Sequence, residues 1–156
     1  MNSRRPSGGN VRMRSAGFTF IELIVILALI PIFTIITLRL LGDFQYRSEL
    51  AKTAEALKQA LTDARTKAII GVAGSRHGVY IEAITGTVTV FEGKTYATRN
   101  QASDIRTTWS PGLVSYSGPS EVVFSKLKGT TTPSTVTLTA PNGTQQIVIN
   151  DVGVID

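Results

Sequence analysis

The sequence predicts an α+β protein, in which a long N-terminal α-helix packs on a C-terminal antiparallel β domain. Three observations support this prediction. An apolar run covers 18–38, helical spacing of apolar residues continues over 43–70, and short alternating runs rich in threonine and valine fill the chain after Gly71. The helix is therefore expected to be apolar in its first half and amphipathic in its second half.

The composition excludes several classes of function. The 156 residues include no cysteine and a single histidine, which excludes a disulfide scaffold, a thiolate metal site and a pair of catalytic histidines. The acidic residues show neither the pairing of catalytic carboxylates nor the spacing of a calcium loop. We therefore expect no enzyme, with no catalytic residues, no metal and no cofactor. The net charge of +5 favours an acidic partner, but four of the sixteen basic residues stand in the first 17 positions.

The first half of the helix has the properties of a membrane-inserting segment. Residues 1–17 are basic and rich in glycine, whereas 18–38 contain one ionisable residue, Glu22, and would span about 30 Å as a helix. The basic residues before the run favour a cytoplasmic N-terminus. A signal peptide is disfavoured because no small-x-small cleavage site follows. A plain anchor leaves the carboxylate unexplained, since it costs about 2.5–3.5 kcal/mol in a membrane. Pro31 is expected to kink or locally open the helix.

The second half of the predicted helix carries an apolar stripe. Apolar residues recur at spacings of three and four over 43–70, so they lie on one helical face. They are mainly alanine and leucine, which allows close packing against a sheet. Asp63 and Lys67, four residues apart, predict an exposed ion pair worth about 0.3–0.5 kcal/mol. The stripe residues are Leu50, Ala54, Leu57, Leu61, Ala64 and Ala68.

Short strand candidates follow a glycine-rich link at 71–78. Thr85-Gly86 and Asn142-Gly143 are the expected turns of two hairpins. The short, evenly spaced strands favour one or two antiparallel sheets over a parallel α/β fold. The candidate strands are 79–84, 87–91, 94–99, 105–109, 113–116, 121–125, 135–140, 145–150 and 152–155.

Three features of this region could suggest chemistry, and each has a simpler structural interpretation. His77 lies in the glycine-rich link with no carboxylate nearby in sequence, so a solvent-exposed loop histidine is expected rather than a general base. Gly93-Lys94-Thr95 resembles the end of a phosphate-binding loop, but Val88 stands where that loop needs glycine. Trp109 is expected to be a core or edge aromatic rather than a ligand platform.

The most specific motif lies where the basic segment meets the apolar run, at Arg14-Ser15-Ala16-Gly17-Phe18-Thr19-Phe20-Ile21-Glu22-Leu23. It resembles the processing site of the type IV pilin and type II secretion pseudopilin superfamily. The resemblance implies cleavage between Gly17 and Phe18 by a prepilin peptidase, followed by N-methylation of Phe18. It also implies that Glu22 serves assembly by neutralising the N-terminus of an adjacent subunit, since each buried charge offsets the other. Cleavage would remove four arginines and leave twelve basic against eleven acidic side chains, a net charge of +1.

The C-terminal part resembles the GspH/FimT-like minor group of that superfamily. In that group a Phe-x-x-x-x-Gly segment precedes a hairpin and a final glycine-containing strand, and Phe124 and Gly129 match the spacing. The absence of cysteine also fits this group better than the major pilins, which often carry a C-terminal disulfide loop. Pro31 departs from the family pattern, because it stands earlier than the familiar pilin proline. The resemblance implies a prepilin leader at 1–17, a transmembrane and filament-core helix at 18–42, an amphipathic helix at 43–70 and a β-rich globular domain at 71–156.

The resemblance implies a structural minor pilin or pseudopilin, a subunit of a type II secretion pseudopilus or a type IV pilus. The expected partners are the prepilin peptidase, other pilin or pseudopilin subunits, and secreted cargo. Before assembly the chain would cross the bacterial inner membrane once, with the N-terminus cytoplasmic and the C-terminal domain periplasmic or extracellular. An alternative from another class is a membrane-anchored exported protein that is never processed.

A second alternative is a DNA-binding minor pilin for DNA uptake. Some FimT-like proteins bind DNA through a Gly-Arg-x-Arg motif near the C-terminus, where this chain has Gly153-Val154-Ile155-Asp156. Phosphate contacts need lysine or arginine, so nucleic acid is the less favoured partner. Four basic residues could still form a patch if the fold gathers them, although a solvated sheet surface is the favoured interpretation. These residues are Arg99, Arg106, Lys126 and Lys128.

Overall fold

The computed structural model describes residues 17–156, and of 35–41 the backbone alone. Residues 1–16 of the predicted leader therefore lie outside the described residues. The chain divides into two compact units, Met1–Arg39 and Leu40–Asp156.

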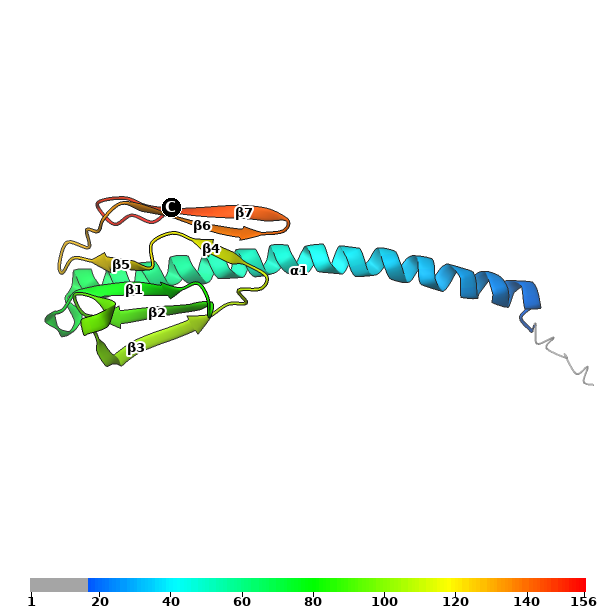
Figure 1. Cartoon of the computed structure of the whole chain (residues 1–156), viewed down its shortest axis with the longest axis horizontal. Coiled ribbons are helices and arrows are strands. Elements are labelled where there is room, and N and C mark those ends of the chain that lie inside the picture. The colour runs from blue at the N-terminus through cyan, green and yellow to red at the C-terminus, as the bar shows by residue number, and fades with distance from the viewer. Residues whose placement is uncertain (1–16) are drawn as a thin grey trace, which may run out of the picture. The chain divides into compact units, whose positions relative to one another are not determined.

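Helix α1 covers Phe20–Ile70 without interruption at Pro31 or Gly42 (Figure 1). Proline lacks an N–H and removes one helical hydrogen bond. The backbone nevertheless stays helical on both sides of Pro31, so the predicted local opening is not found there. Nearby, the Thr34 hydroxyl donates a hydrogen bond of 2.8 Å to the carbonyl of Ile30, four residues earlier.

The second half of α1 buries the predicted stripe. All six stripe residues are at most 6% exposed. They form one hydrophobic core with residues of both sheets, which explains why this half of the helix needs an apolar face. The predicted ion pair is also confirmed, with 2.7 Å between Lys67 Nζ and Asp63 Oδ2.

Seven strands in the described residues form two antiparallel sheets, and Figure 1 shows them beside the second half of α1. The first sheet has the order β3-β2-β1-β5 and the second the order β4-β6-β7. The expectation of one or two antiparallel sheets is therefore confirmed. The strands are β1 His77–Glu82, β2 Thr87–Glu92, β3 Asn100–Thr108, β4 Ser115–Ser117, β5 Glu121–Phe124, β6 Ser134–Ala140 and β7 Gly143–Ile149.

Both predicted hairpins are present. Strands β1 and β2 pair from Glu82 opposite Thr87, and Gly86 in their turn has φ +65°. A Cβ at Gly86 would collide with the carbonyl oxygen of Trp109, so the turn requires glycine. Strands β6 and β7 pair from Ala140 opposite Gly143, which leaves a turn of two residues.

The predicted strand at 94–99 is wrong. Tyr96–Thr98 instead forms a short 3₁₀ helix, η2. The Tyr96 ring stacks on Tyr80 of β1 with 3.8 Å between the ring centroids. The segment therefore folds over the face of the first sheet instead of extending along an edge.

The predicted strand at 152–155 is also wrong, apart from one bridge between Ile155 and Ile149. Gly153 turns the chain with φ +79°, and a Cβ there would collide with the carbonyl oxygen of Gly129. A strand cannot continue through this left-handed conformation.

Trp109 occupies the predicted structural position. It is partly buried against the core, and its indole N–H donates a hydrogen bond of 3.1 Å to the carbonyl of Val114. The indole therefore anchors the segment that leaves β3 toward β4.

Candidate functional site

The predicted cleavage junction lies just before α1. Gly17 and Phe18 precede the first helical residue, Phe20, and belong to no regular secondary structure. Phe18 is 78% exposed, and a Cβ added to Gly17 would meet no atom within 4 Å. Both residues of the predicted cleavage site are therefore exposed among the described residues.

Glu22 takes part in the N-terminal cap of α1. Its Oε2 accepts a hydrogen bond of 3.4 Å from the Thr19 N–H, while Thr19 Oγ1 accepts one of 3.4 Å from the Glu22 N–H. The Thr19 carbonyl also accepts the first helical bond, from Leu23. This arrangement is a capping box, for which Thr-x-x-Glu is the sequence signal. The Thr-x-x-Glu spacing is present at 19–22 of the sequence, but the family resemblance assigns Glu22 a role in assembly and predicts no cap.

The capping bonds hold the carboxylate loosely. Both donor–acceptor distances are 3.4 Å, whereas N–H···O hydrogen bonds in proteins usually measure about 2.7–3.2 Å. Each of these bonds is therefore weak. Within the described part of the chain, Glu22 joins no ion pair. The carboxylate is therefore available to a stronger, positively charged partner.

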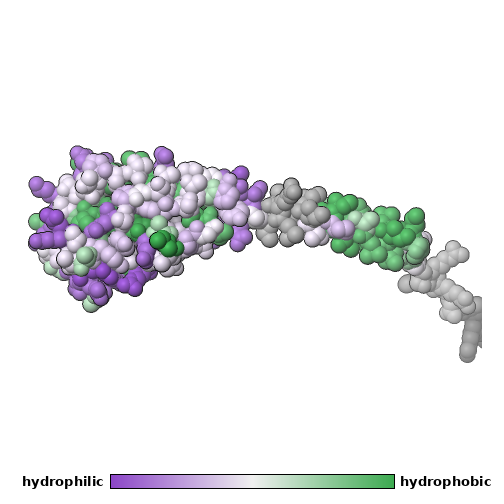
Figure 2. Space-filling view, in the orientation of Figure 1, coloured by the Kyte–Doolittle hydropathy of each residue, from purple (hydrophilic) through white to green (hydrophobic). Residues whose placement is uncertain are grey.

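The described residues of the first unit present apolar side chains on all sides of α1. Each residue from 17 to 34 is exposed, and Figure 2 shows this stretch coloured almost entirely as hydrophobic. An apolar surface of this extent marks a surface that a partner or a membrane covers. The large apolar residues concerned are Phe18, Phe20, Ile21, Leu23, Ile24, Val25, Ile26, Leu27, Leu29, Ile30, Ile32 and Phe33.

Across the residues whose side chains are described, 17–34 and 42–156, no helix is both long enough and apolar enough to cross a membrane. The predicted span at 18–38 extends into 35–38, whose side chains lie outside the description. The predicted helix at 18–42 likewise includes 35–41.

The prediction of an exposed loop histidine is wrong. His77 is the first residue of β1 and is 3% exposed, because the strand begins two residues earlier than predicted. Burial lowers the pKa of the imidazole, against an opposing effect of the Glu92 carboxylate. Its Nδ1 is buried without a hydrogen-bond partner. His77 is thus a core residue, and no group of His, Asp and Glu side chains in the described residues could hold a metal ion.

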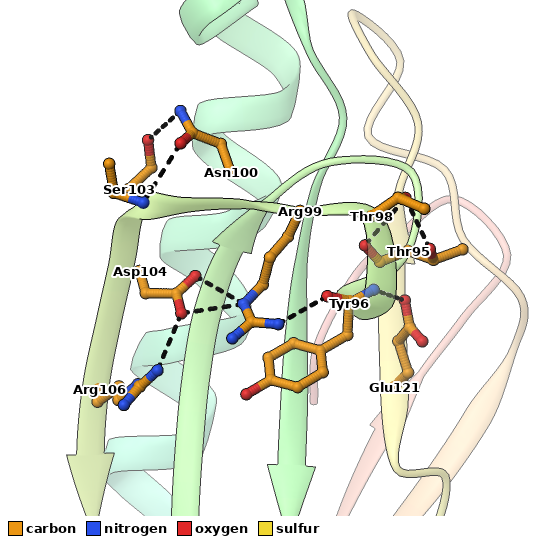
Figure 3. Close-up of polar contacts among 10 residues, drawn as sticks. Thr95, Tyr96, Thr98, Arg99, Asn100, Ser103, Asp104, Arg106 and Glu121 are labelled. Carbon is orange, nitrogen blue, oxygen red and sulfur yellow. Dashed lines mark hydrogen bonds and ion pairs between the residues drawn. The ribbon is translucent and has the colours of Figure 1, made fainter.

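Arg99 and Arg106 share one carboxylate (Figure 3). Arg99 Nε lies 3.1 and 3.0 Å from the two oxygens of Asp104, and Arg106 Nη2 lies 3.2 Å from Oδ2. Arg106 is 60% exposed at its side chain, as a solvated sheet residue should be, but the Arg99 side chain is only 12% exposed. Two of the four residues considered for a basic patch are therefore paired with a carboxylate of the same sheet.

The same network fixes the η2 segment over the sheet (Figure 3). The Arg99 guanidinium lies 3.7 Å from the centre of the Tyr96 ring and donates a hydrogen bond of 2.8 Å to the Tyr96 carbonyl. The Tyr96 N–H donates one of 2.9 Å to Glu121 on β5. Through these contacts, Arg99 and Glu121 hold η2 against β3 and β5.

The Phe-x-x-x-x-Gly spacing has a structural basis. Phe124 is fully buried in β5, and Gly129 closes the following loop by donating a hydrogen bond of 2.9 Å to the Ser125 carbonyl. Gly129 has φ +66°, and a Cβ there would lie 2.7 Å from Cγ1 of Ile69. The spacing thus lets the loop after β5 lie tightly against the last turn of α1.

Comparison with known proteins identifies the fold. No protein-family model matches the chain, and no curated protein matches its sequence. Among solved structures, the minor pseudopilin EpsH from the type II secretion system of Vibrio cholerae aligns with a TM-score of 0.53 and 20% identity, covering 69% of this chain and 94% of that chain. A second crystal structure of EpsH gives a TM-score of 0.52 and 14% identity over 70% and 95%. The chain therefore has a pseudopilin, type IV pilin-like fold, as predicted.

Proposed function

We propose that this protein is a structural minor pseudopilin or minor pilin, a subunit of a type II secretion pseudopilus or a type IV pilus. The proposal rests on two features that occur in the same chain. One is an exposed apolar helical segment with a single carboxylate, and the other is a globular part with the pseudopilin fold. The apolar segment needs a covering surface, and packing of the same segment in neighbouring subunits supplies one. The role is structural, with other pilin or pseudopilin subunits as the main partners and secreted cargo as a further one.

In this proposal the chain passes through the bacterial inner membrane before it assembles. The leader, 1–17, stays cytoplasmic, 18–42 spans the membrane, and the amphipathic helix at 43–70 and the globular domain at 71–156 lie on the far side. A prepilin peptidase then cuts between Gly17 and Phe18, and Phe18 is N-methylated. The exposed, non-helical position of this peptide bond supports the assignment.

Glu22 is proposed to pair with the α-amine of Phe18 in the adjacent subunit. A lone amine or carboxylate is costly in an apolar filament core, whereas the pair offsets much of that cost. The weak capping bonds support this role, because little stabilisation is lost when the carboxylate turns from Thr19 toward a cation.

Substitutions separate the capping role of Glu22 from its charge. Glu22→Gln keeps a capping-box residue but removes the charge, Glu22→Ala removes both, and Thr19→Ala removes the cap while keeping the charge. We expect both Glu22 variants to be cleaved normally and to be depleted from sheared filaments, with Thr19→Ala incorporated. The exposed Glu55 provides the matched control, Glu55→Gln. Normal incorporation of Glu22→Gln would contradict the pairing role.

N-terminal sequencing and intact mass of the membrane-extracted chain test the processing step. The expected product begins at methylated Phe18. A product that still begins with the leader would favour the unprocessed membrane-anchored protein. Salt-dependent retention of DNA by the full chain in a mobility-shift assay would favour the DNA-uptake pilin instead.

A further inference from the structure

Three loops line an open pocket of about 620 Å³. They follow α1, β2 and β5, and each contributes one basic side chain to the lining: Arg76, Lys94 and Lys126 respectively. The hydroxyl residues Ser75 and Thr98 complete the polar wall. These cations are far apart in sequence, so only the fold gathers them.

Backbone hydrogen bonds fix the loops that carry the cations. The Gly93 N–H donates to the Arg76 carbonyl at 2.9 Å and so ties the first loop to the second. Gly74 has φ +65°, and a Cβ added there would lie 3.6 Å from Lys126 Nζ, which places this ammonium directly over the first loop. The loops that carry Arg76 and Lys94 are therefore joined by a backbone hydrogen bond, and the Lys126 ammonium lies beside the first of them.

The three cations lack an acidic partner of their own. None of them takes part in an ion pair within the described portion of the chain. The acid nearest to the lining in sequence is Glu92, which precedes Gly93, and its carboxylate accepts hydrogen bonds of 2.9 Å from Ser103 and 3.4 Å from Asn100. Even with Glu92 counted, the pocket keeps an excess of two positive charges.

This excess is local. Residues 43–156 hold eleven basic and ten acidic side chains, so the globular part is almost neutral and offers little long-range attraction to a polyanion. Nucleic-acid binding typically neutralises about 6–10 phosphates, more than three cations can. The described residues that line the pocket also include no aromatic ring, and such rings are the usual platform for single-stranded bases. The observations favour a short anionic group over a long strand.

We propose that this pocket binds a carboxylate-rich segment of a partner protein, a short run of Asp or Glu side chains that reaches all three cations. Lysine and arginine donate charge-assisted hydrogen bonds to carboxylates, and the lining holds three such side chains. The proposal concerns a different surface from the N-terminal helix and does not depend on cleavage or filament assembly, so failure of the Glu22 test leaves it standing.

A fluorescence-anisotropy titration of the full-length chain in detergent tests this assignment. The probes are labelled hexaglutamate, hexaglutamine of the same length, and single-stranded oligothymidine. We expect hexaglutamate to bind and hexaglutamine not to bind. Added salt should weaken the complex, because the pocket is open and the Debye length falls from about 10 Å at 0.1 M to about 3 Å at 1 M.

A pair of triple variants locates the binding. Arg76→Gln, Lys94→Gln and Lys126→Gln together should weaken hexaglutamate binding by about tenfold or more. The control removes the same charge from α1 through Arg47→Gln, Lys52→Gln and Lys58→Gln, and should change the affinity by less than about twofold. If the pocket triple variant does not fold, Lys126→Gln alone should still weaken binding by about threefold.

Three results would overturn the proposal. Equal affinities for hexaglutamate and hexaglutamine would show that the charge of the peptide does not contribute to binding. Equal losses of affinity in the two triple variants would show that binding depends on the overall charge of the protein and not on this pocket. Tighter binding of oligothymidine than of hexaglutamate, lost in the pocket variant, would make the pocket a nucleic-acid site.

Discussion

At His77, burial and neighbouring charges act on one imidazole. Burial lowers its pKa below 6.5 and is the largest effect, and Lys67 of α1 adds to it. Glu92 of β2, the Ser75 backbone and Asp63 of α1 act in the opposite direction. The folded protein therefore binds a proton at His77 less readily than the unfolded chain does.

The sign of the resulting pH dependence follows from linkage. Well above pH 6.5 the imidazole is neutral in both states, and its effect on the free energy of unfolding is constant. As the pH falls below 6.5, the unfolded chain takes up a proton that the folded protein resists, so stability decreases until the lowered folded pKa is passed. We expect the thermal midpoint to fall between about pH 7 and about pH 5.5.

His77→Gln removes this titration and keeps a polar side chain of similar reach. The variant should show a shallower decrease in thermal midpoint over the same pH range, whatever its absolute stability. Calorimetry or circular dichroism melting of both proteins provides the comparison. Parallel pH curves for His77→Gln and wild type would contradict the assignment.

Single-residue chemistry is predictable from the sequence only where the neighbours are local. Thr19 and Glu22 are three positions apart, so the capping box between them can be recognised from the sequence. His77 is surrounded by groups from α1 and β2, and its burial depends on strand pairing that no local pattern reveals. The pocket cations depend in the same way on three loops that meet only in the folded chain.

In α1, small side chains set how closely the helix approaches the sheets. Ala64 and Ala68 are fully buried one turn apart. Protein interiors are close-packed, so an added side chain there must displace its neighbours. Ala64→Leu should lower the free energy of unfolding by about 1–3 kcal/mol, as overpacking does.

Ala51→Leu is the matched control for this substitution. Ala51 lies on the exposed face of the same helix, and leucine is nearly as good a helix former as alanine. Chemical denaturation of both variants should show a lower midpoint for Ala64→Leu alone. Equal stabilities would mean that the core can accommodate the larger side chain.

The elements were predicted well where one local rule decides them. The α1 stripe follows from the 3.6-residue period, and the two hairpins follow from residues at their own turns. The segment 94–99 was misassigned because its conformation depends on stacking of Tyr96 against Tyr80, sixteen positions earlier. The order of strands in the two sheets was not predicted, since it depends on pairings between segments distant in sequence.

At the scale of the whole molecule, the two units differ in how they bury apolar surface. The second unit, Leu40–Asp156, contains the complete hydrophobic core, whose members and packing neighbours run from Tyr46 to Ile155. The described residues of the first unit, 17–34, contribute none of them. The apolar side chains of that segment therefore lie outside the hydrophobic core of the described residues.

A truncated chain tests whether the second unit folds by itself. Residues 40–156 should unfold cooperatively, with a thermal midpoint within about 4 °C of the full-length protein in detergent, because no core residue is removed. A shorter chain, 58–156, is the control: it lacks Leu50, Ala54 and Leu57, and each buried leucine contributes about 1.5–3 kcal/mol. Since domains of this size have only about 5–15 kcal/mol of stability, this control should be strongly destabilised. Failure of 40–156 to fold would show that the apolar segment supports the globular part as well as carrying the proposed assembly surface.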